Sequence, residues 1–519
     1  MLRLALASVF AAVLVWAQFR AAGLVEIAAT LEIVTGMPAR IYLFKDGKPF
    51  RLSPVDALLP LRVDLFYRER LWRLGPSPRT LEVTSGDESH FLLLDGRAEY
   101  DLPQGSYRVE AYRGTLHKPA SAEFRLKAGE RRNVTLTLEP LAGARDWLAG
   151  DDHIHLTRAP EDDTVFLKWL EAEDLAAGNF LQLQRQMDAS VQYGFGDAAE
   201  ARGRGYSIRS GHESRSHHYG HINLLGASRI LRPLSVGEVY ANAPGAFPFP
   251  AALFEEGRKL GAVVGYAHFE GSQPHSTLLM DLALGTIDFT EVFQFGVLKM
   301  DAWYELLNAG LRVTGIAGSD FPVPLNRARP WPRAIPLLGP ERTFVKTAPG
   351  ASAYKAWAEG VRSGRVVVSN GPLLDLRVNG HGPGETLSAP FAEGEVTVIS
   401  TRPILKMEIV ANGRVVASRT EGHSLTFRVP LEESAWIAAR AQARNESGEP
   451  EIWAHTNPIY VRKDGKPVHV PAARKSVAAR WRAERDYYRS ANLPFDTPEQ
   501  SRLFQEKADQ ALRILEAAP

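Results

Sequence analysis

The middle of the chain, residues 145–372, alternates short apolar runs with segments of helical spacing. Residues 261–267 and 311–317 are apolar runs of the length expected for buried strands. Residues 163–177 carry apolar side chains at intervals typical of an amphipathic helix. Strand–helix alternation of this kind is typical of an α/β domain with a parallel sheet or barrel. The pattern therefore predicts this fold class for the middle of the chain.

On both sides of this region the pattern is that of β structure. Residues 24–140 and 373–463 contain runs with alternating polar and apolar side chains or with many β-branched residues. Turn dipeptides such as Asn412-Gly413 separate these runs. We expect a β-sandwich-like domain on each side of the α/β region. Residues 470–519 are polar and helix-favouring and predict a helical tail, with an apolar stripe of Phe504, Ala508, Ala511 and Leu512.

Charge and cysteine content exclude several classes of protein. The chain has 61 lysines and arginines against 60 aspartates and glutamates, and no polybasic run. Nothing electrostatic therefore favours binding to nucleic acid or to an anionic membrane surface. The chain has no cysteine, which excludes disulfides, thiol nucleophiles, cysteine metal sites and a lipoprotein anchor.

The N-terminus resembles a secretion signal over residues 1–22. Arg3 supplies a positive charge, and the uncharged apolar run 4–17 ends in the small-x-small sequence Val15-Trp16-Ala17. The run is shorter than the ~20 residues that a membrane-spanning helix needs. We therefore predict a secreted or periplasmic protein without a stable membrane span after signal removal. The alternative is an uncleaved anchor.

Side chains that bind metals are concentrated in the α/β region. Eight of the fourteen histidines lie between His153 and His275. The stretch Asp151-Asp152-His153-Ile154-His155 contains a His-x-His pair, whose imidazoles share one face of a strand. His268 and Asp320 directly follow apolar runs, and the C-terminal ends of parallel strands form the edge at which ligands bind. Each of these residues alone is more often a core, loop or cap residue, so the prediction depends on their convergence.

Four motifs occur in order along the α/β region: Gly150-Asp151-Asp152-His153-Ile154-His155, then Ser210-Gly211-His212-Glu213 with Gly220-His221-Ile222-Asn223, then Gly265-Tyr266-Ala267-His268, then Ala317-Gly318-Ser319-Asp320. Together they resemble the CehA/McbA-type metallohydrolases of the polymerase-and-histidinol-phosphatase (PHP) superfamily, and Glu291-Val292 also fits. The resemblance implies a distorted (β/α)7-type PHP barrel with two divalent metal ions, which are zinc, manganese or iron. It also implies the ligands: His153, His155 and Asp320 for one ion, His221 and His268 for the other, and Glu213 as a bridge.

Two positions depart from the superfamily pattern. Most members carry Thr-Asp-His after the second strand, where this chain has Leu181-Gln182-Leu183-Gln184. The fourth motif usually ends in Asp-x-His, where this chain has Asp320-Phe321-Pro322. Both missing histidines belong to the third metal site of trinuclear members. Because the losses fall on one site, we predict two ions rather than three, with Gln182 or Gln184 in the vacated space.

The predicted ligands indicate a hydrolase. Divalent ions lower the pKa of water and polarise substrate oxygens, so we expect a metal-activated hydroxide to attack an ester, amide, carbamate or phosphoester bond of a small molecule. Asp320 is a candidate catalytic ligand, Asp151 or Asp152 a supporting group or proton carrier, and Arg158 a contact for an oxyanion. The alternative for Asp152 is a turn cap. Four further side chains are candidates to bind an anionic substrate group or to orient the ligands, with a solvated loop position as the alternative for each: His212, Arg215, His217 and His218.

Two other functions fit the same sequence. The first is a non-catalytic cell-surface protein that uses a PHP scaffold and the two β domains to bind a carbohydrate or peptide. The second is an extracellular phosphoesterase. Residues 185–210 and 322–340 contain no recognisable motif that would identify the substrate, and the oligomeric state is not readable from the sequence.

Overall fold

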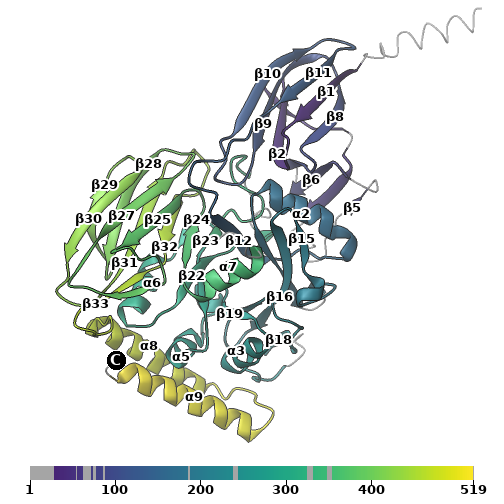
Figure 1. Ribbon diagram of the computed structural model, residues 1–519. Coiled ribbons are helices and arrows are strands. Elements are labelled where there is room, and N and C mark those ends of the chain that lie inside the picture. Colours follow the sequence, from purple (N-terminus) through teal and green to yellow (C-terminus); the bar gives the residue numbers. More distant parts are fainter. Residues whose placement is uncertain are drawn as a thin grey trace, which may run out of the picture.

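A computed structural model describes residues 28–53, 55–61, 72–73, 78–85, 88–184, 188–237, 244–323, 331–347 and 353–517. The predicted signal segment lies outside the described residues. The chain is mixed α/β and rich in strands, with several sheets and a C-terminal helical tail (Figure 1). The predicted α/β class and the helical tail are confirmed at this level.

The N-terminal β region contains two sheets. One has the strand order β11-β1-β8, and the other has the order β10-β9-β2-β7-β6-β4-β5, with β3 paired to β2. Side chains from both sheets, such as Leu31, Ile41 and Val109, share one buried core. The strands are β1 (Ala29–Val34), β2 (Ala39–Lys45), β3 (Lys48–Phe50), β4 (Ala57–Leu61), β5 (Trp72–Arg73), β6 (Thr80–Ser85), β7 (Glu88–Leu93), β8 (Arg97–Leu102), β9 (Gly105–Tyr112), β10 (Ala120–Leu126) and β11 (Arg131–Thr135).

The central region contains the strands that carry the predicted metal ligands. They are β12 (Trp147–Ile154), β13 (Ala177–Gln184), β14 (Asp188–Ser190), β15 (Ala201–Gly203), β16 (Tyr206–Ser216), β17 (Ile222–Leu225), β18 (Ser235–Val236), β19 (Val263–Tyr266), β20 (Phe289–Gln294), β21 (Val297–Leu298), β22 (Thr314–Ala317), β23 (Arg342–Lys346) and β24 (Val366–Ser369). The helices between them are η1 (Pro160–Asp162), α2 (Asp163–Ala172), η2 (Asp197–Ala199), α3 (Pro250–Lys259), α4 (His268–Gly271), α5 (Leu278–Leu284), α6 (Met300–Asn308) and α7 (Ala353–Arg362).

The pairing of the central strands places several strand ends together. β12, β13 and β16 pair in parallel, β17 is antiparallel to both β16 and β19, and β19, β20 and β22 pair in parallel. A parallel bridge between Ile154 and Phe321 then joins the end of β12 to the segment after β22. The pairings therefore return to the first strand. The C-terminal ends of these six strands and the N-terminal end of β17 lie on the same side.

The C-terminal β region continues the central sheet. β32 pairs antiparallel with β24, so hydrogen bonding crosses the boundary predicted at residue 373. β25, β27 and β30 form a separate three-stranded sheet. Asn412 and Gly413 both have positive φ, as the predicted two-residue turn between β28 and β29 requires. The strands are β25 (Leu373–Val378), β26 (Thr386–Ser388), β27 (Phe391–Ile399), β28 (Ile404–Ala411), β29 (Arg414–Arg419), β30 (Ser424–Pro430), β31 (Ala435–Ala443), β32 (Ile452–Thr456) and β33 (Ile459–Arg462).

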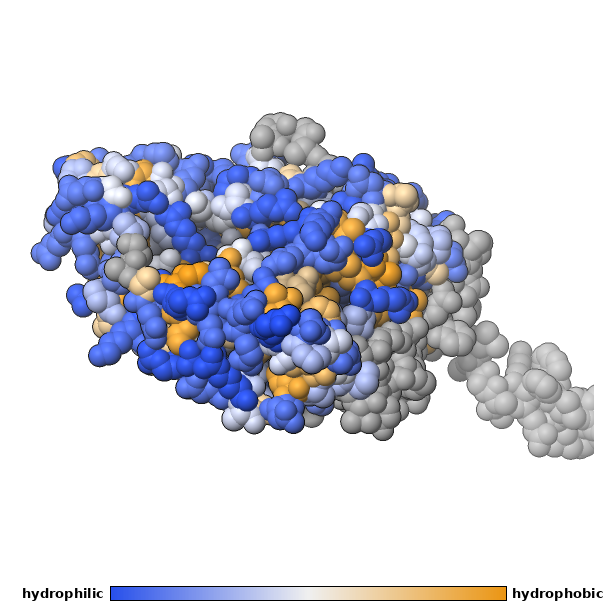
Figure 2. Space-filling view, turned by 90° about the horizontal axis from the view of Figure 1, so that it is seen from below, coloured by the Kyte–Doolittle hydropathy of each residue, from blue (hydrophilic) through white to orange (hydrophobic). Residues whose placement is uncertain are grey.

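The helical tail consists of α8 (Pro471–Ser490) and α9 (Pro498–Glu516), which pack against each other and against α5. The predicted stripe from Phe504 to Leu512 is buried. Figure 2 views the molecule from the side on which the tail lies, and hydrophilic side chains cover most of that face, with apolar patches between them. Within the described residues, no helix is both long and apolar enough to cross a membrane.

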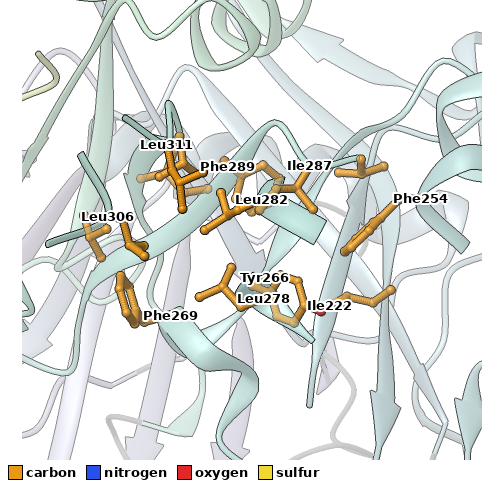
Figure 3. Close-up of a cluster of buried hydrophobic side chains, with 14 of the residues drawn as sticks. Ile222, Phe254, Tyr266, Phe269, Leu278, Leu282, Ile287, Phe289, Leu306 and Leu311 are labelled. Atoms are coloured by element: carbon orange, nitrogen blue, oxygen red, sulfur yellow. The ribbon is translucent and has the colours of Figure 1, made fainter. Parts of the chain in front are cut away.

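A buried core lies between the tail and strands β19 and β20. Tyr266 and Phe289 pack there among leucines of α5 and α6, with Ile222 of β17 and Ile287 beside them (Figure 3). Asp281 of α5 is buried in the same core, where it accepts hydrogen bonds from Tyr266 Oη (2.7 Å) and Thr286 Oγ1 (2.9 Å). Burial raises the pKa of Asp281 from 3.8 to about 7, although these hydrogen bonds oppose the shift.

Replacing Asp281 by asparagine should stabilise the protein more at pH 8 than at pH 5. The folded chain keeps a proton on Asp281 up to a pH of about 7, whereas the unfolded chain releases it near 3.8. The contribution of Asp281 to the free energy of unfolding is therefore lost as the pH rises from 3.8 towards 7, at roughly 1.4 kcal/mol per pH unit. Urea unfolding of Asp281→Asn and the natural chain at pH 5 and pH 8 measures this difference. An equal difference in unfolding free energy between the two chains at both pH values would contradict the raised pKa of Asp281.

Candidate metal centre

The first ligand group is formed by the end of β12 and the segment after β22. The Nε2 atoms of His153 and His155 lie 3.0 Å apart, and they lie 3.4 and 3.3 Å from Asp320 Oδ1. Both imidazoles are buried and face the same side of the chain, as the His-x-His spacing predicts. Ligands at ~2.0–2.1 Å from a tetrahedral metal lie about 3.3–3.4 Å apart. These three side chains therefore have separations that suit one ion.

The second ligand group consists of Glu213, His221 and His268, whose ligand atoms also lie within metal-binding distance of one another. Glu213 Oε1 lies 3.0 Å from His221 Nδ1 and 3.8 Å from His268 Nε2. Glu213 belongs to β16, His221 immediately precedes β17, and His268 follows β19 closely. Because β17 runs opposite to β16 and β19, its first residue lies at their C-terminal ends.

Glu213 faces both groups. Its Oε2 atom lies 3.3 Å from His155 Nε2, while its Oε1 atom faces His221 and His268. Glu213 Oε1 and His221 Nδ1 are buried and form no hydrogen bond with any residue that the structure describes. A buried polar atom without a partner costs free energy. Two such atoms at 3.0 Å suit two ligands of one cation.

One imidazole of each group is held by its second ring nitrogen. His153 Nδ1 lies 2.6 Å from Glu291 Oε1, and His268 Nδ1 lies 2.6 Å from Gln294 Oε1. Histidines that bind metals usually donate their other ring N–H to a carboxylate or carbonyl, which fixes the tautomer. A proton on Nδ1 leaves the Nε2 lone pair of His153 and His268 directed at the cluster.

The electrostatics of the cluster favour a positive charge at its centre. Burial alone would lower the pKa of His153, but the carboxylates of Glu291 and Asp320 raise it well above its ordinary value. Burial would raise the pKa of Glu213, but Arg215 and His221 hold it well below its ordinary range. Burial lowers the pKa of His221 to about 4, so this ring is neutral at pH 7. The negative field of these carboxylates is the environment that a divalent cation requires, and metal binding at such a site releases the protons of its histidine ligands.

Asp151 supports the segment that carries Asp320. Its carboxylate is fully buried and accepts hydrogen bonds from Ser319 N (3.0 Å), Ser319 Oγ (2.5 Å) and Gly339 N (2.9 Å). Asp320 has φ of 51°, a left-handed conformation that persists only when the surroundings hold it. These contacts favour the predicted supporting role of Asp151 over a role as proton carrier.

Asp152 belongs to a buried polar cluster beneath the first group. Asn223 Nδ2 lies 3.1 Å from Glu291 Oε1 and 3.5 Å from Asp152 Oδ2. Burial and the neighbouring Glu291 raise the pKa of Asp152 well above its ordinary value, whereas His153 holds the pKa of Glu291 below its own despite burial. The carboxylate charge therefore resides on Glu291, next to His153.

Arg158 lies among structural contacts. Its guanidinium donates hydrogen bonds to Ser210 Oγ (2.8 Å) and to the carbonyl of Ala199 (3.1 Å), pairs with Asp163 (3.2 Å), and stacks over the ring of Tyr193. Ser210 and Glu213 belong to the same strand. These contacts favour a role for Arg158 in holding β16 over the predicted contact with a substrate oxyanion.

Several other predicted residues lie away from the ligand atoms. Gln182 is in register with His212, the neighbour of Glu213, so both lie on the opposite face of the sheet. Gln182 Oε1 accepts a hydrogen bond from Gln192 N (2.9 Å). The prediction that Gln182 occupies a vacated third site is therefore not supported. The side chain of Gln184 lies outside the described residues, and His217 and His218 belong to the loop before His221.

Glu291 was not predicted as part of the site, although its dipeptide fits the family resemblance. The sequence feature that could have identified Glu291 is its position as the single carboxylate in the otherwise uncharged strand Phe289–Gln294. All six residues of that strand are buried, and a buried carboxylate needs a charged or hydrogen-bonding partner. His153 Nδ1 and the backbone N–H of His268, at 2.6 Å each, are those partners.

Comparisons with known proteins add no functional information. No family model matches the sequence, and no curated protein matches it. The crystal structure of PsfC from Pseudomonas syringae PB-5123 is 15% identical over 41% of this chain and 88% of that chain, with a TM-score of 0.27. The apo structure of Bacteroides uniformis beta-glucuronidase 3 is 12% identical over 83% of this chain and 61% of that chain, with a TM-score of 0.17. Similarities this low carry no argument about fold or activity.

Proposed function

We propose that this chain is an exported, metal-dependent hydrolase of the PHP type, related to the CehA/McbA family. The observation that carries the proposal is the convergence of six predicted ligands into two groups that share Glu213. The return of the strand pairings from β22 to β12 supports a distorted (β/α)7-type barrel with the groups at its C-terminal edge. Export rests on the predicted signal segment.

The side chains divide into two sets of ligands for two divalent ions. His153, His155 and Asp320 would hold one ion, His221 and His268 the other, and Glu213 both. When bound, such ions supply Lewis acidity, which lowers the pKa of water and polarises an ester, amide, carbamate or phosphoester group.

The exposure of the ligand side chains to solvent indicates a role for Asp320. Its side chain is 12% exposed and that of His268 is 10% exposed, whereas His153 and His155 are fully buried. Because these two side chains reach solvent, we propose that substrate approaches the centre from the side of Asp320 and His268. Asp320 Oδ1 faces His153 and His155, and we assign acceptance of a proton from the attacking water to Oδ2. The buried histidines orient the ligand set and exclude water from behind it.

Metal binding tests the proposal directly. The purified chain, stripped with a chelator and titrated with zinc or manganese, should take up two ions. At 100-fold excess over Kd each ion stabilises the fold by about 2.7 kcal/mol, so two ions should raise the thermal midpoint of a chain of this length by about 5 °C. Less than one transition metal per chain, unaffected by His153→Ala, would reject the metalloenzyme proposal. A panel of p-nitrophenyl esters and phosphates then separates carboxylester hydrolysis from phosphoester hydrolysis.

A further inference from the structure

The helical tail contacts both loops that carry histidines of the second ligand group. Tyr488 of α8 donates a hydrogen bond from Oη to the carbonyl of His218 (2.8 Å), three residues before His221. Arg480, two turns earlier on the same helix, pairs with Glu270 (2.7 Å), two residues after His268. In Figure 1 the tail lies below the central region, alongside α5 and α3. One helix therefore contacts two loops that are far apart in the sequence.

The Tyr488 contact is rigid and buried. Tyr488 is 2% exposed, and its ring lies 5.8 Å from that of Tyr219 and 5.4 Å from that of Phe504, centroid to centroid. Trp481 Nε1 donates to the carbonyl of Ala508 (3.0 Å), which ties α8 to α9. The hydroxyl is thus held in place by packing. The Arg480–Glu270 pair is half-exposed, so we expect it to contribute less than the Tyr488 hydrogen bond.

The loop that begins with His268 requires such support. His268 and Phe269 have φ of 55° and 70°, conformations that non-glycine residues keep only when their surroundings hold them. The backbone N–H of His221 donates to the carbonyl of Gly271 (3.0 Å), and that of Ala267 donates to the carbonyl of His221 (3.2 Å). The two loops are therefore tied to each other as well as to the tail.

The first ligand group is held by other parts of the chain. Asp151 fixes the segment before Asp320 through Ser319 and Gly339, and Glu291 fixes His153. Tyr488 and the Nη2 atom of Arg480 contact the loops of the second group, whereas Nη1 of Arg480 pairs with Glu305 of α6 (2.8 Å). A loosened tail should therefore displace His221 and His268 while His153, His155 and Asp320 stay in place.

We infer that the helical tail assembles the second metal subsite, with Tyr488 and Arg480 as positioning residues that act through the His218 carbonyl and Glu270. This inference rests on the proposed two-ion function. The tail makes the affinity of the subsite formed by Glu213, His221 and His268 depend on a segment more than 200 residues away in the sequence.

Zinc titration of the metal-free, full-length chain by calorimetry tests the inference. The natural chain should bind zinc in a tighter and a weaker step. In Tyr488→Phe combined with Arg480→Gln, the Kd of one step should rise about 10-fold or more, as loss of residues that orient metal ligands typically causes, while the other step stays unchanged. Tyr488→Phe removes one oxygen and keeps the ring. If the double variant fails to fold, this single variant decides the test.

A matched control is Arg489→Gln, which removes an ion pair with Asp509 inside the tail (2.6 Å). It should titrate like the natural chain, and Arg480→Lys should restore part of the affinity that Arg480→Gln loses. Unchanged titration of the double variant, or equal weakening of both steps, would overturn the inference. Absence of zinc uptake by the natural chain would instead overturn the proposed function.

Discussion

Replacing Glu213 by glutamine is expected to deplete both ligand groups of metal at once. One carboxylate oxygen faces His155 at 3.3 Å and the other faces His221 at 3.0 Å, so the same negative charge serves both groups. Glutamine keeps the shape of the side chain but removes this charge. The first group then keeps the carboxylate of Asp320, and the second group is left with the imidazoles of His221 and His268 and no carboxylate of its own.

The expected loss exceeds the 10–100-fold that removal of a supporting residue typically costs, so hydrolytic activity should fall by more than about 100-fold. Metal analysis after dialysis should give less than one ion per chain for Glu213→Gln. Glu408→Gln is a suitable control, because Glu408 is also buried and paired with cations but lies on β28, in the C-terminal β region. It should keep the natural metal content. A Glu213→Gln variant that retains two ions would show that Glu213 is not a shared ligand.

Local patterns in the sequence predicted those features of the site that depend on one segment. The His153-x-His155 spacing puts both rings on one face whatever the surrounding fold, and the observed 3.0 Å between their Nε2 atoms follows from that alternation. His268 and Asp320 follow apolar runs, and strand ends in parallel sheets meet at one edge. The assignment of Glu213 and His221 came from family resemblance, because neither has a local signal that distinguishes it from a solvated loop residue.

Contacts between distant segments could not be predicted in the same way. Glu291 reaches His153 across 138 positions, and Asp151 reaches Gly339 across 188, only because the strands pair in a particular order. The left-handed backbone at His268 and Asp320 also has no sequence signature, since neither residue type favours it as glycine does. The tail's contact with the His218 loop depends on where two packed helices come to lie. Such features follow from the assembled fold rather than from any one segment.

Replacing Glu291 by glutamine should weaken metal binding about 10–100-fold without removing a ligand. Glu291 Oε1 faces His153 Nδ1 at 2.6 Å, and its Oε2 accepts the backbone N–H of His268, also at 2.6 Å. A glutamine has one oxygen for these two donors. In either orientation its NH2 group meets a donor, so one buried donor loses its partner, at a cost of about 1–3 kcal/mol.

The two possible effects of Glu291→Gln can be separated. If Glu291 fixes the tautomer of His153, the variant should lose affinity in the zinc step that the Tyr488 and Arg480 variants leave unchanged, since His153 belongs to the first ligand group. If Glu291 only stabilises the fold, the metal-free variant should unfold at lower temperature while its zinc affinity remains natural. Competition with a chromophoric chelator measures the affinity, and thermal unfolding with and without zinc measures the stability. If Glu291→Gln is destabilised but binds zinc as tightly as the natural chain, Glu291 is not the residue that orients His153.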